Sequence, residues 1–191
     1  MRPELWWYVA RATGLVAWAL AVASILWGLA LSTRAGGKRP KAPWLLDLPR
    51  HLGGLTMAAV ALHLVALVAD SFATFDLVDL LVPFASGWRP GPVAWGVVAF
   101  WLLLAVEVTS LLGRRVPKKW WRRVHLTSYV VAVTATVHGL TAGADAGNPV
   151  VLGAVVVATA AIAFFTAYRF LAPKRAAASA RAARSPVPTS V

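Results

Sequence analysis

Histidine is the residue of this sequence whose number and spacing indicate chemistry. The chain has four histidines, and they fall in two apolar segments, with His51 and His63 in one and His125 and His138 in the other. At 1.5 Å per helical residue, the two histidines of a segment lie about 18 to 20 Å apart along the helix. Ionisable side chains are rare inside membrane-spanning helices and mark functional sites there. Each segment therefore offers one imidazole near each end.

Two imidazoles at the same depth on neighbouring helices suit the axial positions of a b-type haem. If the two segments run in the same direction, His63 is level with His138 and His51 is level with His125. We therefore expect an outer haem iron between His63 and His138 and an inner one between His51 and His125. On ideal helices the two histidines of one segment point about 120° to 140° apart, which is unfavourable for this arrangement. The alternative is that each histidine only hydrogen-bonds a neighbouring helix.

The elements that must position these histidines are long apolar helices. Of the 191 residues, 59% are hydrophobic and 14% are charged, whereas soluble domains have about 45–50% and about 25%. About 20 apolar residues suffice to cross a bilayer as a helix. Five segments meet this requirement, so the sequence predicts an all-α integral membrane protein, a bundle of five transmembrane helices. The segments are residues 5–31, 51–72, 93–112, 124–141 and 149–171.

Basic residues indicate the orientation of this bundle. Of the 19 lysines and arginines, 16 lie on one side of a five-span topology, in two connections and the end of the chain. Because cytoplasmic loops are enriched in basic residues, we predict the amino terminus outside and the carboxyl terminus in the cytoplasm. This distribution also accounts for the net charge of +12 without a nucleic-acid partner. We expect one domain over residues 1–171 and a basic, disordered cytoplasmic tail over residues 172–191.

The absence of cysteine removes several kinds of site. It excludes disulfides, zinc–thiolate sites, cysteine-ligated iron–sulfur clusters, thiol catalysis and covalent haem attachment through Cys-x-x-Cys-His. The sequence also contains no G-x-G-x-x-G, so we expect no flavin or nicotinamide domain on this chain. Electrons would have to come from a separate cytoplasmic flavoprotein or from reduced flavin.

Short stretches around the histidines carry a family resemblance. They are residues 48–55 (LPRHLGGL), 62–64 (LHL), 107–112 (EVTSLL), 121–126 (WRRVHL) and 137–140 (VHGL). Together they resemble the ferric-reductase-like transmembrane family, which includes the haem domain of NADPH oxidases and the haem subunit of the bacterial methionine sulfoxide reductase system. The resemblance implies one or two b-type haems bound by histidines of two helices, and electron transfer across a bacterial cell (inner) membrane. Family members commonly have six spans, and this chain resembles that core without its first span.

The resemblance also assigns individual residues. The family's histidines on the span that carries His63 are usually 13 or 14 residues apart, and Pro49 stands 14 residues before His63, so His51 would replace the expected ligand. NADPH oxidases carry an arginine near the propionates of the outer haem, on a helix equivalent to the one that holds Arg11. A propionate contact is therefore the expected role of Arg11, and snorkelling to lipid headgroups is the alternative.

The function expected from these features is transmembrane electron transfer. A cytoplasmic flavin or flavoprotein would reduce the inner haem, and the outer haem would reduce an acceptor outside, such as a ferric chelate or a partner reductase. The protein would be the membrane component of a haem-dependent oxidoreductase, with no catalytic residues beyond the haem ligands. The competing interpretation is a non-redox, five-span structural or assembly subunit that uses histidine for helix contacts.

Overall fold

In this computed structural model, all the long elements of the described residues are α-helices. The structure describes residues 4–33, 42–71 and 74–183, without the side chains of residues 4, 114 and 172–183. The all-α class predicted from the sequence is confirmed for this part of the chain. Its helices are α1 (Glu4–Thr33), α2 (Pro43–Ala69), α3 (Leu77–Leu81), α4 (Pro90–Leu112), the 3-10 turn η1 (Gly113–Arg115), α5 (Lys118–Leu126), α6 (Ser128–Ala142) and α7 (Pro149–Ala183).

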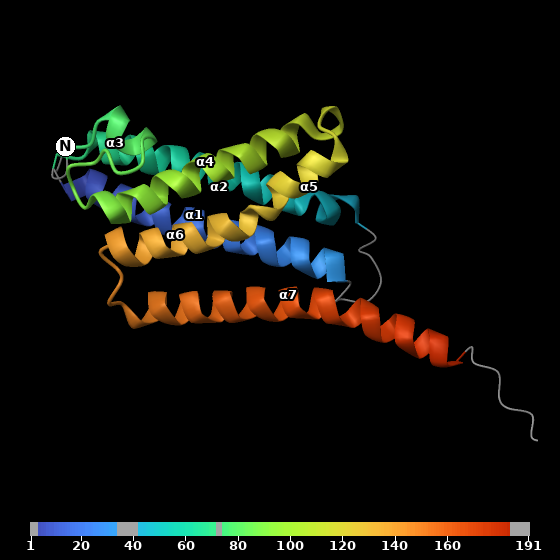
Figure 1. Cartoon of the computed structure of the whole chain (residues 1–191). Helices are drawn as coiled ribbons and strands as arrows, with labels where there is room; N and C mark the ends of the chain where they lie inside the picture. Colours follow the sequence, from blue (N-terminus) through green and yellow to red (C-terminus); the bar gives the residue numbers. More distant parts are fainter. Residues whose placement is uncertain (1–3, 34–41, 72–73, 184–191) are drawn as a thin grey trace, which may run out of the picture.

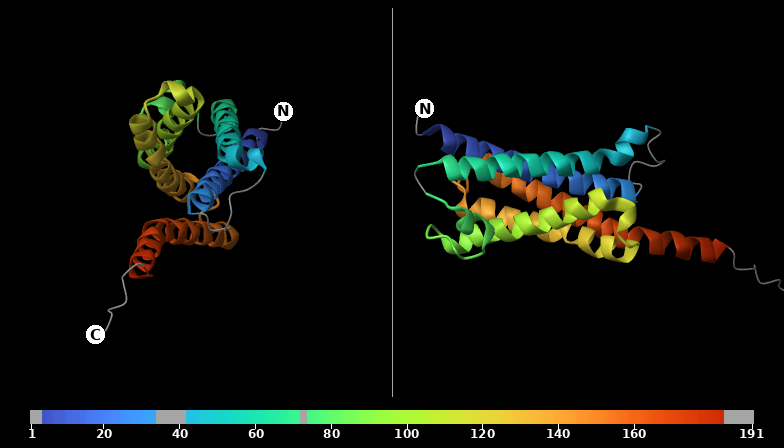
Figure 2. Two further views of the ribbon diagram at one scale, coloured as in Figure 1. Left: turned by 90° about the vertical axis from the view of Figure 1, so that its right-hand side faces the viewer. Right: turned by 90° about the horizontal axis from the view of Figure 1, so that it is seen from above.

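The long helices lie side by side and alternate in direction along one bundle (Figure 1). Helix α1 packs mainly against α2, and α4 packs mainly against α6, so the bundle contains two antiparallel helix pairs. Helix α7 lies at the edge of the bundle and contacts α1 (Figure 2). The start of α1, α3 and the connection from α6 to α7 share one end, which we call the amino-terminal end. Helix α5 lies at the opposite end, which we call the α5 end.

Four helices, α1, α2, α4 and α7, are long and apolar enough to cross a membrane. Their outward surface carries many exposed large apolar side chains, among them Leu62, Val65, Leu111, Val156 and Phe164. Apolar surface on this scale is unfavourable in water and is well covered by lipid tails. These features indicate a membrane protein.

The fourth of the five predicted spans, residues 124–141, is divided at Thr127 into α5 and α6, and α6 alone has 15 residues. The amide of Thr127 donates to the carbonyl of Val124 at 2.9 Å, and the Thr127 hydroxyl donates to the same oxygen at 2.6 Å. A three-residue hydrogen bond tightens the helix, and a hydroxyl bonded to a preceding carbonyl bends it. Four helices meet the length criterion by themselves, and a fifth span made of α5 and α6 remains a prediction.

Helix α2 begins at Pro43 and continues through Pro49. Pro49 has no N–H, so the carbonyl of Leu45 lacks its usual donor within the helix. The Nε1–H of Trp27 on α1 donates to that carbonyl at 2.8 Å, and the hydroxyl of Ser24 donates to the Pro49 carbonyl at 3.1 Å. Two hydrogen bonds from α1 thus join the first helix pair where the helical ladder of α2 is interrupted.

The connection between α2 and α4 contains the short helix α3. Helix α3 is closed by a capping box, in which the Asp76 carboxylate accepts from the Asp79 amide at 2.9 Å and the Asp79 carboxylate accepts from the Asp76 amide at 3.0 Å. Leu80 of α3 is buried against Val93 and Val97 of α4. This packing holds the connection against the amino-terminal end of the bundle.

Helix α7 continues to Ala183, so residues 172–183, which we expected to be disordered, are helical. This segment is rich in alanine, the residue with the highest helix propensity, and propensity requires no repeating apolar face. The remaining tail residues 184–191, and residues 34–41 with four of the basic residues that set the predicted orientation, lie outside the described residues.

Candidate functional site

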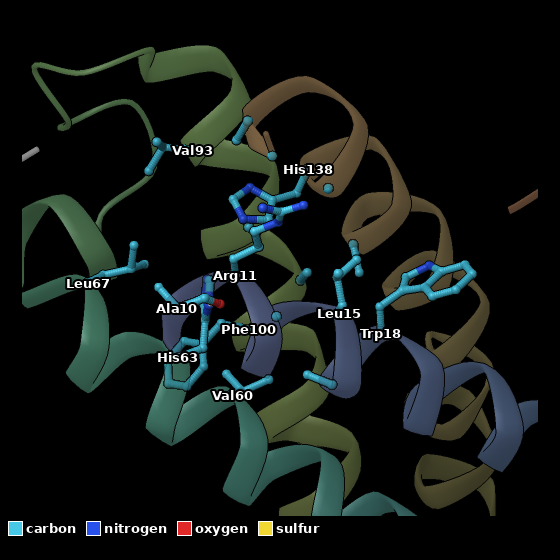
Figure 3. A pocket seen from close by; sticks show the side chains of 18 of the residues that line it. Ala10, Arg11, Leu15, Trp18, Val60, His63, Leu67, Val93, Phe100 and His138 are labelled. Carbon is cyan, nitrogen blue, oxygen red and sulfur yellow. The ribbon is translucent and has the colours of Figure 1, made fainter. Parts of the chain in front are cut away.

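A cavity of about 430 Å³ lies between the two helix pairs (Figure 3). Side chains of α1, α2, α4 and α6 line it, and Val151 and Val155 of α7 complete one side. Most of the lining is apolar, and the volume falls within the range of about 300–1,000 Å³ that is usual for ligand pockets. Two of the four histidines, His63 and His138, are part of the lining.

His63 reaches the cavity from α2 and is seated against the backbone of α1. Its Nδ1 lies 2.7 Å from the carbonyl oxygen of Ala10. Because a carbonyl oxygen only accepts, Nδ1 carries the proton and donates it. Gly14 lies one turn further along α1, and a Cβ atom there would be 3.2 Å from both Nδ1 and Cε1 of the His63 ring. The ring therefore occupies the space that a side chain at residue 14 would take.

His138 is held in the same way within the other helix pair. Its Nδ1–H donates to the carbonyl oxygen of Pro92 on α4 at 2.9 Å. Gly96 lies one turn further along α4, and a Cβ atom there would be 2.8 Å from Nδ1 and Cε1 of the His138 ring. Each histidine thus uses Nδ1 to contact the partner helix of its own pair.

The Nε2 atoms of His63 and His138 are left for a ligand. Within the described residues neither Nε2 has a hydrogen-bond partner, and no enclosed side-chain nitrogen or oxygen lacks one. Both Nε2 atoms are therefore accessible, and both side chains line the cavity. Metal-bound histidines commonly have this arrangement, with one nitrogen on the metal and the other donating to a backbone carbonyl or carboxylate.

The separation of the two rings suits a shared metal. The ring centroids of His63 and His138 are 6.4 Å apart, and the ring planes are inclined by 84°. A metal–nitrogen bond of about 2 Å and a nitrogen-to-centroid distance of about 1.2 Å place two imidazoles on opposite sides of one metal with centroids about 6.4 Å apart. The structure therefore brings the rings of His63 and His138 together at a centroid separation equal to that of two imidazoles on one metal.

Arg11 lines the same cavity and is paired with Asp145. Its Nε donates to one carboxylate oxygen at 2.5 Å, and its Nη2 donates to the other. The guanidinium also lies over the ring of Trp7, at 5.2 Å from the ring centroid. Sequence reasoning offered a haem propionate or lipid headgroups as the partner of Arg11. It did not pair Arg11 with Asp145, because the two residues meet only when α1 packs beside the connection from α6 to α7.

Other polar residues of the lining were not identified as site residues from the sequence. Asp70 at the end of α2 and Arg89 at the start of α4 line the cavity at its amino-terminal end. Deeper in the cavity, the Nε1–H of Trp18 on α1 donates to the hydroxyl of Thr136 on α6 at 2.9 Å. The cavity is therefore apolar inside and charged at the amino-terminal end. The sequence did offer a signal for Arg89, because this residue lies apart from the 16 basic residues on the predicted cytoplasmic side.

His51 and His125 are arranged differently. His51 is exposed, and its Nδ1 donates within its own helix to the carbonyl of Asp47 at 3.0 Å. The ring of His125 stacks on Trp121, with centroids 4.6 Å apart. Neither residue lines the cavity, and in the described part of the chain no ring contact joins them as one joins His63 and His138. On α2 the angular offset turns His51 away from His63, and His125 lies on α5, which Thr127 separates from the α6 helix that carries His138.

No protein-family model matches the chain, and no curated protein or solved structure is significantly similar to it. The resemblance to the ferric-reductase-like family therefore rests on the motifs around the histidines.

Proposed function

We propose that this protein binds a b-type haem in the cavity, with Nε2 of His63 and Nε2 of His138 as the axial ligands. The observation that carries this proposal is the 6.4 Å separation of the two rings at an apolar cavity. Both rings already have the protonation that ligation requires, because Nδ1–H is donated to a backbone carbonyl in each case.

The number of ligands favours haem over a metal ion held by the protein alone. Protein-held metal ions usually have three or four side-chain ligands. In the described ranges, no group of three or more histidine, cysteine, aspartate or glutamate residues is placed to hold a metal ion. A haem supplies four nitrogen ligands itself and leaves two axial positions. Two histidines are therefore the set that a haem needs.

The remaining lining fits the other parts of a haem. Apolar side chains such as Leu67, Val93 and Phe100 exclude water from the cavity. Arg89 provides positive charge for a propionate at its amino-terminal end, and Arg11 would have to exchange its partner Asp145 to bind one. When bound, the haem supplies one-electron redox chemistry, and the protein sets its potential through ligation, burial and nearby charge.

The proposed role is electron transfer across a bacterial cell membrane. The basic residues of α5 support a cytoplasmic location for the α5 end, with the amino terminus outside. The His63–His138 site then lies in the outer half of the membrane and serves an acceptor outside, such as a ferric chelate or a partner reductase. The electrons come from a cytoplasmic flavin or a separate flavoprotein. A second, inner haem at His51 and His125 is part of this proposal and is supported by the sequence motifs.

A non-redox structural subunit is the second candidate. The hydrogen bonds from His63 to Ala10 and from His138 to Pro92 favour it, because each joins two helices without any ligand. The two candidates differ in the use of Nε2, which only the haem-binding protein needs.

Haem content decides between them. The full chain is produced with ample haem and purified, and absorbance spectra are recorded before and after reduction with dithionite. We expect low-spin, bis-histidine spectra and at least about one haem per chain by the pyridine haemochrome assay. A content below about 0.5 haem per chain would support the structural subunit instead.

Four alanine variants locate the site. His63→Ala and His138→Ala are expected to remove the more stable haem, because each removes an axial ligand beside the cavity. His51→Ala and His125→Ala are the matched controls and are expected to remove at most a second haem. If His51→Ala removed all haem and His63→Ala removed none, the cavity would not be the principal site.

A further inference from the structure

The two helix pairs hold their histidines with the same backbone device. In each pair one helix carries the histidine and the other carries a glycine. The carbonyl oxygen four residues before that glycine accepts a hydrogen bond from the histidine. Gly14 and the Ala10 carbonyl hold His63, and Gly96 and the Pro92 carbonyl hold His138. The same spacing on two different helices indicates one solution used twice around the cavity.

We propose that Gly14 and Gly96 are positioning residues that set the tautomer and ligand strength of the two histidines. This inference rests on the proposed haem function for its redox consequence, whereas its tautomer consequence concerns the protein alone. Both glycines line the cavity. Each acts through the ring that lies against it.

Helix geometry explains why glycine is needed. A helical carbonyl at residue i accepts from the amide of residue i+4, which here is the glycine itself. The histidine Nδ1–H uses the second lone pair of that oxygen, and it reaches this position by crossing the space above residue i+4. A methyl group at Gly14 would lie 3.2 Å from the His63 ring, and one at Gly96 would lie 2.8 Å from the His138 ring. Alanine at residue 96 therefore forces the ring to move, whereas alanine at residue 14 requires the His63 ring to give by only a few tenths of an ångström.

The Nδ1–H bond has a chemical consequence at Nε2. Donation to a carbonyl fixes the proton on Nδ1, leaves Nε2 unprotonated and increases the basicity of the ring. A more basic axial imidazole stabilises the oxidised iron and lowers the potential of a haem. Loss of either bond weakens ligation and raises that potential.

The test compares two site variants with two controls on the same helices. Gly14→Ala is paired with Gly28→Ala on α1, and Gly96→Ala is paired with Gly91→Ala on α4. A Cβ atom at Gly28 or Gly91 has no neighbour within 4 Å. All four variants replace a helical glycine with alanine and so gain helix propensity, although Gly91, which precedes Pro92 in the first turn of α4, gains less. Gly14 and Gly96 also line the cavity, so differences within a pair report the contact with histidine in the haem-free protein.

The first readout needs no haem. In the haem-free protein, ¹⁵N chemical shifts of the imidazoles are expected to show His63 and His138 protonated at Nδ1. Gly96→Ala is expected to lose this signature for His138, and Gly14→Ala to weaken it for His63, while the controls keep it. Wild-type rings protonated at Nε2, or variants that keep the Nδ1 signature, would overturn the inference whether or not haem binds.

The second readout uses the haem-loaded protein. We expect Gly96→Ala to weaken haem binding by about 10- to 100-fold, as changes around metal-bound histidines commonly do, and to raise the midpoint potential. Gly14→Ala is expected to act in the same direction with a smaller change, and it decides the question if Gly96→Ala does not fold. Wild-type protein without haem would contradict the proposed function alone. Haem-loaded variants with the affinity and potential of their controls would overturn the positioning role.

Discussion

At the scale of single residues, the pair of Arg11 and Asp145 shows how a charge is tolerated beside an apolar cavity. Asp145 is only 7% exposed, and both of its carboxylate oxygens accept from Arg11. Breaking such a pair leaves one charge without its partner, and the penalty is larger for the more buried charge. The bond also ties the connection between α6 and α7 to α1.

Three variants test this pair by thermal unfolding of the purified protein. We expect Arg11→Ala to be the more destabilising single change, because it leaves the buried Asp145 carboxylate unpaired. Asp145→Ala is expected to be milder, since Arg11 is more exposed. The loss of stability in the double variant is expected to be smaller than the sum of the losses in the two single variants. Additive effects in this cycle would mean that the two side chains do not interact.

The sequence identified His63 and His138 as candidate ligands but did not identify the backbone carbonyls that hold them. Helix spacing and the direction of the two segments predicted that His63 and His138 are level, and their ring centroids lie 6.4 Å apart. The contacts at Ala10 and Pro92 depend on how each helix is rotated against its partner, which spacing does not determine. Glycine in an apolar helix has many uses, and the sequence alone does not distinguish Gly96 from Gly91.

At the scale of elements, Pro49 and Trp27 explain how α2 stays helical through a proline. The Trp27 indole donates to the Leu45 carbonyl that Pro49 leaves without a donor. We expect Trp27→Phe to reduce the free energy of unfolding by about 1 kcal/mol, the usual effect of one hydrogen bond. Unfolding in mixed detergent micelles measures this change.

A proline replacement gives the control for that prediction. Pro49→Ala supplies an amide that can donate to the Leu45 carbonyl within the helix. Trp27→Phe is therefore expected to have a smaller effect in the Pro49→Ala background than in the wild type. An equal effect in both backgrounds would assign the role of Trp27 to packing of its ring.

Helix ends and interruptions were the features of the elements that the sequence predicted least well. Apolar length identified the segments that became α1, α2, α4 and α7, because burial in lipid depends on composition over a whole window. The division at Thr127 depends on one hydroxyl and one three-residue hydrogen bond. The helical extension of α7 depends on alanine propensity. Neither feature alters the apolar pattern on which the segments were identified.

At the scale of the whole molecule, the cavity exists because two helix pairs pack more closely within themselves than against each other. Each pair brings one histidine, one carbonyl and one glycine, and the two histidines meet between the pairs. The site therefore forms only when the α1–α2 pair and the α4–α6 pair lie in the right relative position. A single pair offers only one of the two proposed axial ligands and part of the apolar lining.

The arrangement of this bundle in the membrane has a direct test, because the chain contains no cysteine. Single replacements Gly87→Cys, Lys119→Cys and Gly147→Cys place one thiol before α4, in α5 and between α6 and α7. In intact cells a membrane-impermeant maleimide is expected to label residues 87 and 147 and to spare residue 119, which becomes reactive only after the membrane is opened. This outcome requires α4 to cross the membrane and requires α5 and α6 together to cross back. It also places the end of the cavity with Arg11 and Asp145 outside. Labelling of residues 119 and 147 from the same side would show that α5 and α6 do not form a fifth span, and labelling of residue 119 alone would reverse the orientation and the side on which electrons leave.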